Sequence, residues 1–258
     1  MDFISIKKNE RITTVTLNRP EVMNAINPQM HDELQAAFDD FAADPEQFIC
    51  VITGAGDRAF CAGSDLKAVA GGGHRHYPKN GYAGLIERFD CPKPFVAAVN
   101  GLALGGGFEV ALACDIIIAA DTASFGLPEP LVGAVALGGG LHRLARQIPL
   151  KKAMGMILAA RRVSAAEGEA LGFVTQVVPA VDLRAETDRW CAEILRGSPM
   201  AIRASKECIV RGLDESGVEA AMANQPAYPG FVAWQNSEDA REGPTAFAEK
   251  RAPEWKGR

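Results

Sequence analysis

The sequence predicts an α/β fold that ends in a mostly helical C-terminal part. Short apolar runs alternate with stretches of helical periodicity over most of the chain, which is the pattern of α/β proteins. The end of the chain carries helical patterns alone. The chain has 258 residues, 48% of them hydrophobic, so it can bury a sizeable core in one domain with a smaller part attached.

The first elements are expected to be a strand pair and a helix. Residues Phe3–Lys7 and Ile12–Leu17 alternate in polarity, which predicts two paired strands. Asn27 then precedes Pro28, a pair typical of a helix N-cap and first helical position. Apolar side chains follow at helical spacing and are expected to share one face: Met30, Leu34, Ala37, Phe38 and Phe41.

Strands and one more helix follow in the middle of the chain. They are expected as a strand over Phe48–Thr53, a glycine-rich loop over Gly54–Ser64, a strand over Phe95–Val99, a helix over Gly105–Cys114 and a strand over Ile116–Ala120. The stretch Phe95–Ala120 is apolar enough for a membrane span, but Asn100, three glycines, Glu109 and Asp115 interrupt it. A buried strand followed by a buried helix is therefore the better interpretation.

The C-terminal part is expected to be helical over Leu183–Leu195, Met200–Arg211, Gly217–Asn224 and Asp239–Lys250. We therefore place an α/β core over residues 1–195 and a helical part over residues 196–258. Late apolar helices either cap their own chain or pack across an oligomer, and the pattern alone leaves both open.

Composition excludes several classes of function. The net charge is −5, and no basic cluster suggests a nucleic-acid surface. The opening MDFISIKKNE lacks the pattern of a signal peptide, and six cysteines without a C-x-x-C pair suit reduced thiols in a cytoplasmic protein. The four histidines have no metal-ligand spacing, and His74 and His76 fall in a Gly-rich loop that often borders an active site.

Carboxylates are the unusual feature of the apolar middle. No Lys or Arg occurs between Phe95 and His142. Asp115 and Asp121 flank a predicted strand and are expected to bond loops at its ends. Glu109 lies inside the apolar helix, and Glu129 lies between two prolines on what we expect to be a rigid extended segment. Such carboxylates have raised pKa values, so they suit either general acid–base chemistry or structural hydrogen bonding.

Glycines precede Glu109 and offer a backbone site. Gly105–Gly107 open the predicted helix, where N–H groups are unpaired. The Gly106 N–H could therefore hold a developing oxyanion, and the loop Ala59–Lys67 could supply a second N–H near Ser64. The sequence has no G-x-S-x-G, P-loop or G-x-G-x-x-G motif.

These features occur in motifs that resemble the enoyl-CoA hydratase/isomerase (crotonase) family over nearly the whole chain. The motifs, in family order, are LNRPEVMNAI (17–26), ITGAGDRAFCAGSDLK (52–67), KPFVAAVNGLALGGGFEVALACDIIIA (93–119), ASFGLPEPLVG (123–133) and AEGEALGFVTQVV (166–178). The tail SEDAREGPTAFAEKRAPEWKGR (237–258) resembles the carnitinyl-CoA dehydratase branch.

The resemblance implies a spiral of repeated β-β-α units whose helical part packs in trimers, often paired into hexamers. It implies an acyl-CoA thioester substrate, no metal and no separate cofactor. The oxyanion hole maps onto the N–H groups of Ser64 and Gly106. Hydratases of the family use two glutamates, which map onto Glu109 for the water and Glu129 for the α-proton. Isomerases commonly keep only the later one, so the pair favours hydration or dehydration.

By the same resemblance, the substrate and its CoA part are expected to contact Val22, Met23, Asn24, Ala62, Asp65, Leu66, Lys67, Gly105, Leu137 and Lys250. The sequence departs from the family at Ala136 and Leu137, where proline and glycine are usual, and at Ser64, where alanine is usual. The Leu137 side chain is expected to narrow the acyl site, change the substrate or weaken hydration.

Three functions follow from these residues. The leading hypothesis is a 2-enoyl-CoA hydratase. The alternative is a carnitinyl-CoA dehydratase or another acyl-CoA enzyme of the family, such as an isomerase. The third is an inactive member that binds acyl-CoA, which the retention of both glutamates disfavours.

Overall fold

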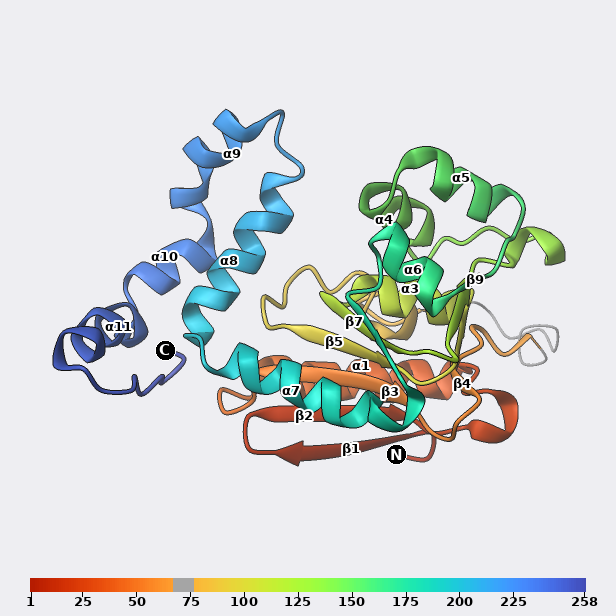
Figure 1. Ribbon diagram of the computed structural model, residues 1–258, viewed down its shortest axis with the longest axis horizontal. Helices are drawn as coiled ribbons and strands as arrows, with labels where there is room; N and C mark the ends of the chain where they lie inside the picture. The colour runs from red at the N-terminus through yellow and green to blue at the C-terminus, as the bar shows by residue number, and fades with distance from the viewer. Residues whose placement is uncertain (67–76) are drawn as a thin grey trace. The chain divides into compact units, whose positions relative to one another are not determined.

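The computed structural model describes residues 1–66 and 77–258, which form two compact units (Figure 1). The first unit contains Met1–Arg88 and Phe95–Arg189. The second contains Phe89–Pro94 and Trp190–Arg258. The Gly-rich loop with His74 and His76 lies outside the described residues.

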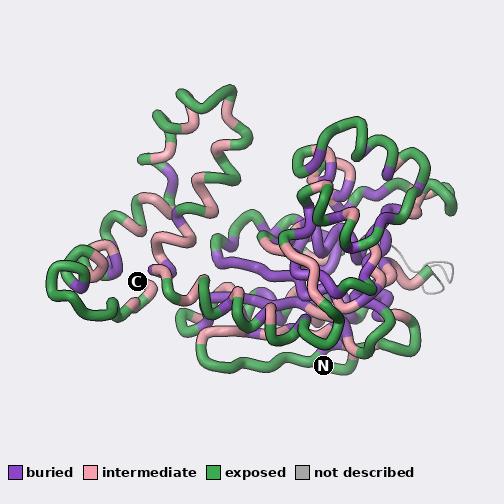
Figure 2. The backbone as a smooth tube through the Cα atoms, viewed as in Figure 1, coloured by how far each residue is buried: buried purple, intermediate pink, exposed green. Residues whose placement is uncertain are grey.

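A six-stranded sheet forms the base of the first unit, in the order β1-β2-β3-β5-β7-β10. Its strands are β1 (Ile4–Asn9), β2 (Ile12–Leu17), β3 (Ile49–Gly54), β5 (Phe95–Val99), β7 (Ile116–Ala120) and β10 (Gln176–Val178). The first two strands pair antiparallel and the others parallel. The central strand β5 is buried along its whole length, and β7 is buried at every residue after Ile116 (Figure 2), as expected for parallel strands covered on both faces.

A second sheet of four short strands has the order β4-β6-β8-β9. Its strands are β4 (Ala59–Cys61), β6 (Leu102–Leu104), β8 (Ser124–Gly126) and β9 (Val163–Ser164). Each long strand β3, β5 and β7 is followed by a short strand that joins this second sheet. The chain therefore advances through both sheets together, and the expected spiral of repeated units is confirmed.

In the sequence, the helices of the first unit lie between these strands, except α7, which follows β10 and continues into the second unit. They are α1 (Pro28–Ala43), α3 (Gly106–Ala113), α4 (Gly140–Gln147), α5 (Leu150–Leu158), α6 (Ala165–Leu171) and α7 (Leu183–Leu195), with 3-10 turns η1 (Pro20–Val22), η2 (Tyr82–Gly84), η3 (Glu129–Val132) and η4 (Ala180–Asp182). Asn27 caps α1 as expected, since its side-chain oxygen accepts the Met30 N–H at 2.8 Å. The five apolar residues expected on one face of α1 are all buried.

Two expectations about local structure were wrong. The loop expected over Gly54–Ser64 contains strand β4, because a strand of three buried residues shows no alternation. Glu129 does not lie on an extended segment but begins the 3-10 turn η3. Pro130 follows it, and proline favours the first turn of a helix because its φ is already helical.

The second unit is helical, as expected. It contains α8 (Pro199–Gly212), α9 (Val218–Asn224), η5 (Gln225–Ala227), α10 (Pro229–Gln235) and α11 (Glu238–Glu249). Among the α-helices of this unit, α10 was not expected, and neither were α4, α5 and α6 in the first unit. The unit begins at Trp190, inside α7.

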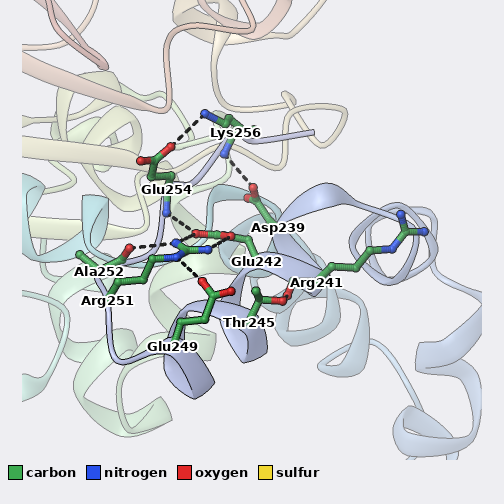
Figure 3. A network of polar contacts seen from close by, with 9 residues as sticks. All are labelled: Asp239, Arg241, Glu242, Thr245, Glu249, Arg251, Ala252, Glu254 and Lys256. Carbon is green, nitrogen blue, oxygen red and sulfur yellow. Dashed lines mark hydrogen bonds and ion pairs between the residues drawn. The ribbon is translucent and has the colours of Figure 1, made fainter.

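The tail after α11 folds back onto that helix (Figure 3). Arg251 pairs with Glu242 at 2.5 Å, and the Glu254 N–H donates to the same carboxylate at 2.7 Å. The Lys256 N–H donates to Asp239 at 2.8 Å. Backbone donors on a buried or shared carboxylate fix the path of the chain, whereas exposed ion pairs add little stability.

Within the described ranges, none of the helices has the length and hydropathy that a bilayer crossing requires.

Candidate active site

The turn from β6 into α3 requires glycine at consecutive positions. Gly105 has a φ of 54°, which L side chains rarely adopt. A Cβ on Gly106 would lie 2.6 Å from a ring carbon of Tyr82, and one on Gly107 would lie 2.7 Å from the Cys61 carbonyl carbon. The backbone at the start of α3 therefore packs so closely on Tyr82 and Cys61 that it leaves no room for a side chain at Gly106 or Gly107.

A second backbone segment lies beside this turn. The Ile26 N–H donates to the Gly63 carbonyl at 2.8 Å, and the Asp65 N–H donates back to Ile26 at 2.9 Å. A Cβ on Gly63 would lie 3.2 Å from the Gly106 nitrogen. The peptide that links Gly63 to Ser64 is consequently a direct neighbour of the Gly106 N–H.

Ser64 and Gly106 thus present two N–H groups close together. Neither N–H donates to another residue in the part of the chain that the structure describes. Gly106 is also the first residue of α3, where the helix leaves N–H groups unpaired and the dipole is positive. This pair of donors is suited to an oxygen that gains negative charge.

Glu109 lies one turn into α3 and is 4% exposed. Its Oε1 accepts the Gly140 N–H at 2.9 Å, at the start of α4, which packs on α3 (Figure 1). A Cβ on Gly138 would lie 2.7 Å from the Glu109 carboxyl carbon, and one on Gly140 would lie 3.0 Å from Oε1. The backbone at Gly138 and Gly140 therefore packs directly against this carboxylate.

Burial raises the pKa of Glu109 from 4.5 to about 7. The Gly140 N–H opposes this shift, the charge of Glu129 adds to it, and Gly138 and Arg143 oppose it weakly. The group therefore changes its protonation near neutral pH, which suits an acid–base catalyst.

Glu129 lies beside Gly105, the first residue of the glycine turn. A Cβ on Gly105 would lie 3.1 Å from Glu129 Oε1. Its Oε2 is buried and has no hydrogen-bond partner among the described residues. Burial raises the pKa of Glu129, while its own backbone N–H lowers it. A buried carboxylate oxygen without a partner is costly, so this oxygen is available to a substrate.

The two carboxylates therefore converge on the start of α3, beside the two N–H groups. One can take a proton while the other gives one, at the turn that also carries the oxyanion donors. Structural hydrogen bonding, the other interpretation of the acidic residues, holds for Asp115 and Asp121. Asp115 accepts the Phe95 N–H at 2.8 Å, and Asp121 accepts the Ala180 N–H at 3.2 Å.

The segments expected to contact CoA lie side by side. The Ala62 N–H donates to the Met23 carbonyl at 3.0 Å. Val22 and Leu66 are exposed, at 39% and 57%, and Asp65 pairs with Arg19 at 3.0 Å.

Asn24 has a structural side chain: it accepts the Arg19 N–H and donates to the carbonyls of Ala55 and Ala59. Its backbone N–H donates to the Arg19 carbonyl at 2.8 Å, so its own carbonyl oxygen is the group left for a ligand.

Three other expected contacts have separate positions. Leu137 is 75% exposed, and its N–H donates to Val135 at 2.9 Å, whereas Ala136 is buried. Lys250 ends α11 in the second unit. Lys67 lies outside the described residues. The contacts of Leu137, Lys250 and Lys67 with a substrate remain predictions.

The sequence did not reveal several residues of this site. Tyr82 packs on Gly106, and Arg143 lies in the electrostatic environment of Glu109. Arg143 is the first cation after the apolar block, which is the signal that would have drawn attention to it. No three His, Cys, Asp or Glu side chains among residues 1–66 and 77–258 gather as around a metal ion.

Comparison with known proteins places these features in a family. The family model described as "Enoyl-CoA hydratase/isomerase" matches residues 7–258. A protein named carnitinyl-CoA dehydratase from Proteus mirabilis is 42% identical over 254 residues, covering 96% of this chain and 95% of that protein. Its namesake from Escherichia coli K12 is 42% identical over 262 residues, covering 99% and 98%.

Solved structures agree with this placement. The enoyl-CoA hydratase from Mycobacterium tuberculosis superposes with a TM-score of 0.93 at 35% identity, covering 100% of both chains. The one from Mycobacterium marinum has a TM-score of 0.93 at 37% identity, again covering 100% of both chains.

Proposed function

The chain belongs to the enoyl-CoA hydratase/isomerase family, and from this premise we propose that it adds water reversibly to the double bond of a 2-enoyl-CoA. The product would be a 3-hydroxyacyl-CoA. The observation that carries the proposal is the convergence of Glu109 and Glu129 on the glycine turn that presents the Gly106 N–H.

In the proposed hydration, the thioester oxygen accepts the N–H groups of Ser64 and Gly106. Glu109 takes a proton from water, and the water oxygen forms a bond to the β-carbon. The electron pair of the double bond moves onto the thioester, which becomes an enolate. Glu129 then donates its proton to the α-carbon, and the carbonyl is restored. Dehydration runs through the same steps in reverse.

The test is the loss of the conjugated-thioester absorbance when purified protein meets crotonyl-CoA and longer enoyl-CoAs. We expect Glu109→Gln and Glu129→Gln each to lower turnover by about 10²-fold or more, as removal of an acid or base does. Asp121→Asn is the control, because that exposed carboxylate holds a loop. Activity that survives both glutamine variants would contradict the mechanism and favour an inactive, acyl-CoA-binding member.

A second candidate is carnitinyl-CoA dehydratase. It is favoured by the relatives of that name at 42% identity over nearly the whole chain. The reaction at the α- and β-carbons would be the same, but the γ-carbon would carry a trimethylammonium group. Matched kinetics with crotonyl-CoA and with its γ-trimethylammonium analogue decide between the two. A preference for crotonyl-CoA and no turnover of the cationic substrate would remove this candidate.

We also propose that three copies assemble, alone or as a pair of trimers. Apolar side chains at 59–75% exposure lie on η3 and α5, namely Leu131, Val132, Leu150 and Leu158. Exposed apolar groups in such numbers are typical of interfaces. Sedimentation equilibrium should give three or six times the chain mass, and a monomer would contradict the proposal.

A further inference from the structure

Tyr82 touches both residues that would form the oxyanion hole. The residue is 3% exposed and lies at the start of η2. A Cβ on Gly106 would lie 2.5 Å from the Tyr82 hydroxyl oxygen, so this hydroxyl covers the Gly106 α-carbon. The Ser64 hydroxyl donates to the same oxygen at 3.3 Å. The phenol therefore lies directly beside the two N–H groups.

His31, in α1, holds the turn that carries Tyr82. Its Nδ1 accepts the Ala83 N–H at 2.9 Å, and its ring meets the Tyr82 ring edge to face at 4.6 Å. Burial lowers the pKa of His31 to about 4, although the charge of Asp32 opposes this. His31 therefore stays neutral and keeps the lone pair that fixes Ala83, whose φ of 56° is unusual for alanine.

A second contact anchors the same segment to α1. The Gln35 side-chain amide donates to Asn80 at 2.8 Å, and the Asn80 N–H donates back to Gln35 at 3.0 Å. These reciprocal bonds restrain Tyr82, because they fix the backbone just before it. A group held this way is preorganised, which is what electrostatic catalysis needs.

The Tyr82 hydroxyl can direct its hydrogen toward a substrate. Ser64 can supply the hydrogen of the bond between the two side chains, which leaves the phenol hydrogen for another acceptor. Besides the Ser64 hydroxyl, none of the residues that the structure describes is bonded to this phenol. Burial raises the pKa of Tyr82 well above its usual value, so the hydroxyl keeps this hydrogen at any working pH. It is a donor and not a base.

We propose that Tyr82 is a third donor of the oxyanion hole, and that its hydroxyl bonds the thioester oxygen as that oxygen becomes an enolate. Ser64 then has two roles: its N–H binds the oxygen directly, and its hydroxyl orients the phenol. This inference rests on the proposed acyl-CoA chemistry. It also assigns a role to the side chain of Ser64, at a position where alanine is usual in the family.

The main test is the Tyr82→Phe variant, which removes the hydroxyl and keeps the ring. Turnover should fall about 10- to 100-fold, at or below the lower limit of the usual cost of a lost oxyanion donor, with KM changed by less than about threefold. Tyr77→Phe is the control. Its ring lies 5.6 Å from that of Tyr82, but Tyr77 is 41% exposed, so removal of its hydroxyl should leave turnover unchanged.

A second readout does not depend on turnover. The carbonyl stretch of a carbon-13-labelled saturated acyl-CoA thioester reports how strongly the bound oxygen is polarised. We expect a downward shift on binding to the wild type and to Tyr77→Phe, and a smaller shift with Tyr82→Phe. If the wild type binds but hydrates no enoyl-CoA, the proposed function fails while this comparison still tests Tyr82.

Ser64→Ala completes the test because it keeps the backbone N–H. It should cost less than Tyr82→Phe, and the double variant should cost less than the product of the two single effects. A full carbonyl shift with Tyr82→Phe, or unchanged turnover with a normal unfolding midpoint, would overturn the proposal. A fall in turnover without any change in the carbonyl shift would also overturn it, because the hydroxyl would then contact another atom.

Discussion

Glu109→Gln should stabilise the protein at alkaline pH while it removes activity. In the folded chain the pKa of Glu109 is raised from 4.5 to about 7, mainly because burial disfavours the charged form. The folded state therefore binds this proton more tightly than the unfolded state does. Stability falls as pH rises through this window, and below pH 4.5 there is no penalty.

The size of the effect follows from the shift. About 2.5 pKa units correspond to about 3.4 kcal/mol, reached in full above pH 7. Between pH 5 and pH 8, the linkage relation gives the wild type an extra loss of about 2.5 kcal/mol relative to Glu109→Gln. The amide can still accept the Gly140 N–H, and any cost of the substitution that does not depend on pH cancels in this difference.

The assay is urea unfolding followed by circular dichroism at both pH values, with protein concentration held fixed because an oligomer couples unfolding to dissociation. Asp121→Asn, which changes an exposed carboxylate, should follow the wild type. If Glu109→Gln and the wild type lose the same stability between pH 5 and pH 8, Glu109 is not a carboxylate held at a burial cost, and its assignment as a tuned acid–base group fails.

Three further predictions follow from the same site. Turnover should have a bell-shaped pH profile, because the reaction needs one proton shared by the pair Glu109–Glu129. The alkaline limb, where the pair loses this last proton, should lie near pH 7, the value to which burial raises the pKa of Glu109, and it should move in Glu109→Gln. Gly138→Ala should lower turnover by about 10²-fold and the free energy of unfolding by about 1–3 kcal/mol, because the new Cβ would lie 2.7 Å from the Glu109 carboxyl carbon and must displace that carboxylate. Equal kcat values for variant and wild type would contradict this. Leu137→Gly should change the unfolding free energy by less than about 1 kcal/mol, because the side chain is 75% exposed. The same substitution should change the order of kcat/KM values across acyl chain lengths, and an unchanged order would show that Leu137 does not line the acyl site.

The sequence predicted the elements whose pattern is long enough to repeat. The apolar face of α1, from Met30 to Phe41, shows the helical period over about three turns, and β5 and β7 are continuous apolar runs. The strands β6 and β8 have three residues each, so neither alternation nor an apolar run could distinguish them from loop. Their existence depends on pairing with strands distant in the chain.

The site was predictable where its chemistry conflicts with its surroundings. Glu109 stood out as a carboxylate among apolar residues, and the glycines before it indicated a close approach to backbone. Tyr82 gave no such signal, because a tyrosine is ordinary in any core. It is brought to Gly106 by contacts with His31, and the neighbouring Ala83 is bonded across 52 positions of sequence. Contacts of that range are properties of the fold.

Glu129 was predictable in part. Its charge and the flanking prolines correctly indicated a carboxylate on rigid backbone, but the expected extended conformation was wrong. Whether the backbone turned was decided by Pro130 and by Gly133, which closes η3 at a φ of 68°. The direction of the carboxylate toward Gly105 required the structure.

The most direct test of the central claim is product analysis in oxygen-18 water. Purified protein is incubated with a panel of 2-enoyl-CoAs, including the γ-trimethylammonium member, and the acyl-CoA products are examined by mass spectrometry. We expect a product heavier by one labelled water, with the oxygen on the β-carbon, and about a hundredth as much or less from Glu109→Gln or Glu129→Gln within the same time. No labelled product from any substrate with the wild type, or equal labelling with the glutamine variants, would contradict it.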